Sequence, residues 1–185
     1  MIARRSNPHI RSNINLVMAA LVLVCTSVSA NAPITPTEQL APREEHKRAT
    51  RLITHFLANY HYKNPPLDDA LSEKILDRYI EILDPTKSYL LASDIAEFEK
   101  HHDMLDDYLR HSDLQPIYDM YLRYRERLGQ RVTMAIASLD QPFDFTRDET
   151  FMFDRKEAGW AESTQDLDEL WRKRVKNDTL SLRLA

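Results

Sequence analysis

The residues with the clearest potential for chemistry are the histidines, of which this chain of 185 residues has seven. His101 and His102 are followed by Asp103, and Glu97 lies one helical turn before His101, so Glu97 and His101 could share a helix face. A metal site would need a second ligand pair on another helix, and neither such a pair nor an H-E-x-x-H motif is present. The other histidines considered, His46, His55 and His61, are spaced more weakly still. A solvated helix face explains these residues better than a metal site, and no metal ligand is predicted.

Glycine-dependent motifs are excluded, because the only glycines are Gly129 and Gly159. The phosphate loop, the dinucleotide fingerprint and the G-x-S-x-G nucleophile elbow each need glycines at fixed spacing. The carboxylate pairs Asp68-Asp69 and Asp106-Asp107 are typical of helix ends and surfaces, and nothing in the sequence makes them an acid/base couple. We therefore predict no catalytic residue and no cofactor.

An alternation of aromatic and basic residues could indicate a nucleic-acid surface. It comprises Tyr118, Tyr121 and Tyr124 together with Arg123, Arg125, Arg127 and Arg131. Aromatic residues facing the core and arginines facing water would give the same run. The acidic charge of the chain also argues against nucleic acid, and no nucleic-acid partner is predicted.

Residues 1–30 have the order of a secretory signal peptide. Basic residues without any acid come first, then the apolar run 16–25, then Val28-Ser29-Ala30 as a small-residue cleavage site. The run is shorter than the roughly 20 residues that span a bilayer. A lipid anchor at Cys25 is the competing interpretation, which the bulky Val24 before it disfavours. Export to the periplasm and no stable membrane span are predicted.

Cleavage after Ala30 would leave 155 residues with 22 basic and 29 acidic side chains, because three of the 25 basic residues lie in the signal peptide. The single cysteine leaves with the signal, so the mature domain has no disulfide. Residues 31–42, rich in Pro and Thr, are predicted to be a flexible leader, and 43–185 to be one helical domain.

Apolar periodicity predicts four helices in the first part of this domain, over residues 43–60, 68–83, 94–110 and 113–139. Asp84-Pro85 ends the second helix, since the residue before a proline avoids the α conformation. Tyr89 and Leu90 should be buried in this corner, and Asp94 should cap the third helix. Ser112-Asp113 offers a cap for the fourth helix, in which Gly129 would mark a close helix contact or a bend.

Residues 143–159 lack a helical period and are rich in aromatic side chains, so this loop should pack over the helices. Ser163 or Thr164 then caps a last helix with apolar positions from Leu167 to Leu182. The predicted fold is all-α, with about five helices in an irregular bundle and an aromatic-rich packed loop before the last helix.

Three blocks in order, DRYIEILDPTKSYLLASD, FDFTRDETFMFDRKEAGW and ELWRKRVKNDTLSLRL, resemble the N-terminal helical domain of tail-specific (carboxy-terminal processing) serine proteases of the bacterial periplasm. The resemblance covers nearly everything after the leader. It implies a parent enzyme that processes or degrades exported proteins from their C-termini with a serine nucleophile and a lysine base, beside a PDZ module. No block of this chain matches those catalytic parts, so no catalytic residue is carried over and the chain alone is expected to be inactive.

The resemblance further implies a scaffold that frames the PDZ and catalytic domains and docks a helical-repeat adaptor lipoprotein. Since the second helical segment and the later domains of such proteases are not matched, the sequence is predicted to be truncated, as a shortened gene product or an isolated domain. Two alternatives remain open. One is a stand-alone exported helical binding protein, and the other is a metal-binding helical bundle.

Overall fold

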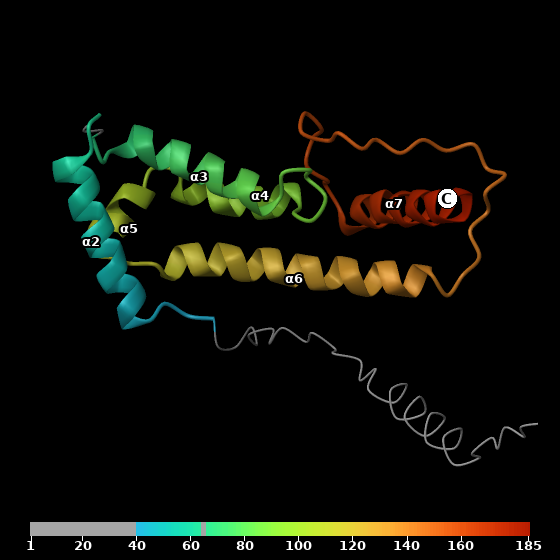
Figure 1. The fold of residues 1–185 in the computed structure, drawn as a ribbon, viewed down its shortest axis with the longest axis horizontal. Helices are drawn as coiled ribbons and strands as arrows, with labels where there is room; N and C mark the ends of the chain where they lie inside the picture. The colour runs from blue at the N-terminus through green and yellow to red at the C-terminus, as the bar shows by residue number, and fades with distance from the viewer. Residues whose placement is uncertain (1–39, 64–65) are drawn as a thin grey trace, which may run out of the picture. The chain divides into compact units, whose positions relative to one another are not determined.

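A computed structural model describes residues 40–63 and 66–185, which lie in the unit Pro36–Ala185 (Figure 1). The predicted signal peptide and residues 31–39 of the leader lie outside the described residues. Within the described residues the structure has six α-helices and no strand, which confirms the all-α prediction. The helices are α2 (Glu44–Tyr60), α3 (Asp69–Leu83), α4 (Ala92–Phe98), α5 (Leu105–His111), α6 (Gln115–Ser138) and α7 (Thr164–Leu184), with a short 3-10 helix, η3 (Glu99–His101), after α4.

Helix α3 forms as the sequence predicts. The Asp68 side chain caps it by accepting a hydrogen bond from the Leu71 N–H at 3.0 Å, and the helix ends at Leu83, one residue before Asp84-Pro85. Its apolar stripe packs into the core of the domain. The buried residues of that core are Leu76, Ile80, Leu90, Phe98, Leu105 and Met120. The prediction that Leu90 is buried is confirmed, because its side chain is 0 % exposed, while Tyr89 is half-buried.

The single helix predicted over 94–110 is wrong, because the chain forms α4, η3 and α5 there. Two hydrogen bonds between α5 and α3 accompany this break. The Asp106 N–H, in the first turn of α5, donates to the Ser72 hydroxyl of α3 at 2.7 Å, and that hydroxyl donates to the Asp106 carboxylate at 2.8 Å. This exchange anchors α5 on α3 and supplies a partner that the interior of a continuous helix would have supplied.

Asp94 does not cap α4 as predicted. The N-cap is Leu91, and Asp94 lies at the third helical position, from which its carboxylate accepts the Leu91 N–H at 3.0 Å. Ser112 is likewise no cap of α6: it ends α5 with φ at 56°, in the left-handed region. Leu114 is the N-cap of α6, and Asp113 accepts the Gln115 N–H at 3.2 Å.

Helix α6 runs past Gly129 without interruption, and a Cβ added there would meet no atom within 4 Å. The predicted close helix contact at Gly129 is therefore wrong. The apolar stripe predicted on α6 is only partly buried, since Val132 and Leu139 are exposed. Met120 and Arg131 are the buried residues of this helix.

The apolar stripe of α2 is exposed. Helix α2 packs against α5, yet none of its residues is buried. Its exposed apolar residues, between 43 and 72 % exposed, are Leu52, Ile53, Phe56, Leu57 and Tyr60. We call these five residues the α2 stripe.

After α6 the chain passes to the other side of α7 and returns to its start as an extended loop, residues 139–163 (Figure 1). We call it the return loop. Ser163 caps α7 in a capping box with Asp166, which confirms the predicted start of the last helix. The return loop packs less completely than predicted, because Phe153 is 70 % exposed. No helix in the described part of the chain is long and apolar enough to cross a membrane.

Candidate functional site

The residues considered for metal binding take part in separate contacts. His101 Nδ1 lies 2.8 Å from the Tyr108 hydroxyl, while Glu97 lies 3.6 Å from the Lys100 ammonium. In residues 40–63 and 66–185, no three His, Cys, Asp or Glu side chains come together as a metal site would need. The carboxylate pairs also separate, since Asp68 caps α3 and Asp106 bonds to Ser72.

Two arginines of the aromatic-basic run point inward, contrary to the prediction that they face water. Arg127 donates to both carboxylate oxygens of Asp94, at 2.8 and 3.0 Å, and joins α6 to α4. Burial by itself would raise the pKa of Asp94, but the hydrogen bonds from Arg127 and the Leu91 N–H outweigh it and lower the pKa below its ordinary value. Arg131 is buried and pairs with Asp168 at the start of α7. Arg127 and Arg131 therefore join helices of the domain through ion pairs.

The Asp-Pro corner is held by the side chain of Asp84. Its buried carboxylate accepts the backbone N–H groups of Ser88 and Tyr89 at 2.8 Å each and of Leu90 at 3.0 Å. The Ser88 carbonyl in turn accepts the indole N–H of Trp171 at 2.7 Å, which fixes α7 on the corner. Sequence reasoning treated Asp84 only as a helix stop and missed this anchoring role.

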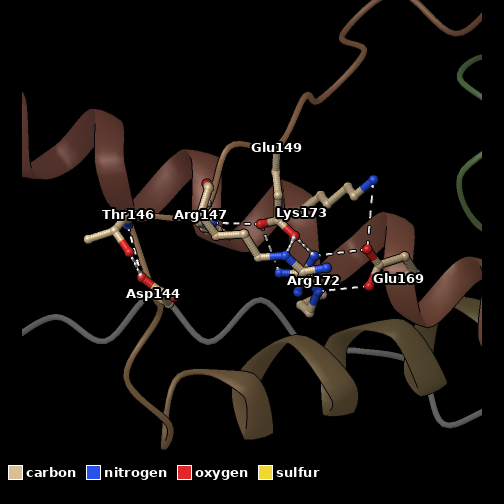
Figure 2. A network of polar contacts seen from close by, with 8 residues as sticks. Asp144, Thr146, Arg147, Glu149, Glu169, Arg172 and Lys173 are labelled. Carbon is tan, nitrogen blue, oxygen red and sulfur yellow. Dashed lines mark hydrogen bonds and ion pairs between the residues drawn. The ribbon is translucent and has the colours of Figure 1, made fainter.

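A polar network fixes the return loop on α7 (Figure 2). Glu149 of the loop, 10 % exposed at its side chain, accepts from Arg172 at 2.5 and 3.3 Å and from Lys176 at 2.6 Å. Arg147 adds a third cation at 3.3 Å, and Glu169 of α7 accepts from the other edge of Arg172. The apolar periodicity of the sequence could not predict this network, because the return loop has no helical period.

The network also sets the protonation of its members. Hydrogen bonds from Arg172 and then Lys176 lower the pKa of Glu149 to about 2. Hydrogen bonds to Glu169 and Glu149 raise the pKa of Arg172 above its already high ordinary value. Glu149 and Arg172 are therefore both charged at neutral pH, which suits a structural clamp better than a proton-transfer site.

Next to this clamp lies an open pocket of about 410 Å³ between the return loop and α7. Its walls combine Phe145, Phe151 and Leu180 with the charged side chains of the clamp. The charges that the clamp contributes to these walls already have partners within the clamp.

The family described as "Tail specific protease N-terminal domain" matches residues 53–185. The chain belongs to this family. It is also 38 % identical, over 142 residues, to the tail-specific protease of Haemophilus influenzae. That alignment covers 76 % of this chain and 20 % of the relative, so the chain spans about a fifth of the length of the relative that it matches.

Membership in the tail-specific protease family confirms the resemblance drawn from the three sequence blocks. The matched region contains the corner, the inward arginine pairs and the clamp. All of these features lie within the residues that the family matches, and about four fifths of the relative's length lies outside the match.

Proposed function

We propose that this chain is the non-catalytic N-terminal scaffold of a periplasmic tail-specific serine protease, and that it acts by docking onto the PDZ and catalytic parts of the enzyme. The observation that carries the proposal is the exposed α2 stripe. Five large apolar side chains on one helix face form a patch that a soluble monomer rarely leaves uncovered. The match covers only a fifth of the relative. The remaining part of such an enzyme is the partner that would cover this patch.

A second exposed apolar surface supports the same proposal. On α7, Leu182 and Leu184 are 81 and 79 % exposed, although Leu167 and Trp171 on the same helix are buried. The burial of each such side chain in a complex would contribute roughly 1.5–3 kcal/mol.

The full enzyme would then process exported proteins from their C-termini, while this part frames the substrate and offers a surface to a helical-repeat adaptor lipoprotein.

The test combines the chain with the Haemophilus influenzae relative expressed without its matching N-terminal region. We expect the two to co-elute, and hydrogen exchange to slow across α2 and the end of α7. Phe56→Ser in the α2 stripe should weaken the complex. Tyr62→Ser is the matched control, because Tyr62 is equally aromatic and 85 % exposed but lies after the helix.

The alternative has a distinct outcome. A clean monomer with a protected last helix, no complex with the remainder and no effect of Phe56→Ser would overturn the scaffold proposal. That result would favour a stand-alone exported helical binding protein.

A further inference from the structure

A small pocket of about 180 Å³ opens where the Asp-Pro corner, the return loop and α7 meet. The corner contributes Thr86 and Ser88, the loop contributes Phe151, Phe153 and Arg155, and α7 contributes Arg174 and Asp178. This pocket is separate from the clamp, since it shares only Phe151 with the larger pocket beside Glu149.

The two arginines of the pocket have no acidic partner among the described residues. The Nε of Arg155 is buried and makes no hydrogen bond there. An unsatisfied buried donor costs about 1–3 kcal/mol, so such a group calls for an explanation. The Arg174 guanidinium stacks on the Trp171 ring, 4.7 Å from its centroid, which holds the guanidinium in place.

Two acids that line a neighbouring pocket together with Arg155 already have partners. Asp166 and Glu169 line the neighbouring pocket to which Arg155 also contributes. Asp166 accepts from Ser163 in the cap of α7, and Glu169 accepts from Arg172 in the clamp. Both carboxylates therefore have other partners, and the buried Arg155 Nε–H has none among the described residues.

The remaining walls define what would fit between the arginines. The hydroxyls of Thr86 and Ser88 are used within the corner, where Thr86 donates to Ser88 at 3.0 Å and Ser88 donates to the Thr86 carbonyl at 3.1 Å. Phe151 and Phe153 supply apolar surface. Asp178 leaves a net charge of +1 in the lining, which suits a monoanion better than a phosphate dianion.

We propose that this pocket binds a peptide carboxylate next to an apolar side chain, with Arg155 and Arg174 holding the carboxylate and the two phenylalanines contacting the apolar group. Guanidinium groups pair with carboxylates through strong, charge-assisted hydrogen bonds. The site is independent of the scaffold role, because it involves neither the α2 stripe nor the end of α7.

The test is an NMR titration of the full chain that follows the arginine Nε–H signals and the Trp171 indole. The first probe is N-acetyl-Phe-Glu-amide, whose only charge is the side-chain carboxylate, and N-acetyl-Phe-Gln-amide is its neutral match. N-acetyl-Gln-Phe with a free C-terminus distinguishes a terminal carboxylate from a side-chain carboxylate. Inorganic phosphate is the fourth probe.

We expect saturable binding of a carboxylate probe and none of the neutral one. Arg155→Gln and Arg174→Gln should each weaken binding by at least about tenfold, the loss of one charge-assisted hydrogen bond. Asp178→Asn should strengthen it. Arg51→Gln, on α2, is the charge-matched control and should have no effect. Phe153→Ala should weaken binding, whereas Met152→Ala, outside the pocket, should not.

Several results would overturn the proposal. Equal binding of the charged and neutral probes, or no saturation with either carboxylate, would exclude a carboxylate site. Phosphate binding at the same arginines, as tight as that of the peptides, would identify a general oxyanion site instead. If circular dichroism shows that Arg155→Gln fails to fold, Arg155→Lys and Arg174→Gln decide the outcome, since unchanged affinity in both would reject the assignment.

Discussion

Removal of the Asp84 carboxylate should destabilise the whole domain. Its two oxygens accept hydrogen bonds from three backbone N–H groups at distances of 3.0 Å or less, and Asp84 is only 1 % exposed. A hydrogen bond to a charged group contributes about 1.5–3 kcal/mol, and an orphaned buried donor costs a comparable amount. Because the three bonds share one carboxylate, their energies do not add fully, and we expect Asp84→Ala to lower the free energy of unfolding by about 3–5 kcal/mol.

Asp84→Asn separates the loss of charge from the loss of the side chain. The amide oxygen can keep the hydrogen bonds from Tyr89 and Leu90, but its NH₂ group would then face the Ser88 N–H, donor against donor. We expect an intermediate loss of about 1–3 kcal/mol. The order of stability should therefore be wild type, then Asn, then Ala.

The assay is urea unfolding of the full chain, followed by far-ultraviolet circular dichroism and by tryptophan fluorescence. Trp171 reports the corner directly, because its indole donates to the Ser88 carbonyl. With a urea slope of about 1–3 kcal/mol/M, the expected loss moves the midpoint by about 1 M or more. Asp77→Ala, an exposed aspartate on α3, is the control and should change stability by less than about 0.5 kcal/mol. An Asp84→Ala midpoint equal to that of the control would refute the anchoring role.

Three further predictions concern the core, the clamp and the signal peptide. Leu90→Ala should cost roughly 2–5 kcal/mol, because Leu90 is completely buried in the core, and an unchanged urea midpoint would contradict this. The folded-state pKa of Glu149, about 2, lies below its ordinary value of 4.5, so its stabilising contribution is present above pH 4.5 and is lost as the pH falls toward 2. Glu149→Gln should therefore lower the urea midpoint at neutral pH and match wild type near pH 2; a difference independent of pH would argue against the clamp. Export should remove residues 1–30 by cleavage between Ala30 and Asn31, and N-terminal sequencing of a mature protein that still begins at Met1 would disprove this.

The strongest sequence signals lay in features that depend on neighbours along the chain. Helix α3, its stop at Asp84-Pro85 and the Ser163 cap of α7 were predicted to within a residue or two. The start of α4 was less accurate, because an aspartate can bond the N–H of an N-cap three residues before it as well as serve as the cap itself. The pattern of sequence alone does not distinguish these two arrangements.

Ion pairs and hydrogen bonds between residues far apart in the sequence were not predicted. Arg127 and Arg131 have the charge and spacing of a solvated helix face, and only their opposition to Asp94 and Asp168 in the fold turns them inward. In the same way, the split between α4 and α5 depends on Ser72, which is 34 residues away from Asp106. The apolar stripe of α2 predicted the helix itself, yet none of the residues of that helix is buried.

By itself, the sequence determined the helical class, the main helix ends and the family, because apolar period, caps and prolines act over a few neighbouring residues. Only the tertiary structure decided which polar side chains became internal. The Asp84 anchor required the corner to fold back on itself, and the Glu149 clamp required the return loop to reach α7. Both bring together charges and backbone groups whose pairing depends on distances in space, which no local spacing in the sequence encodes.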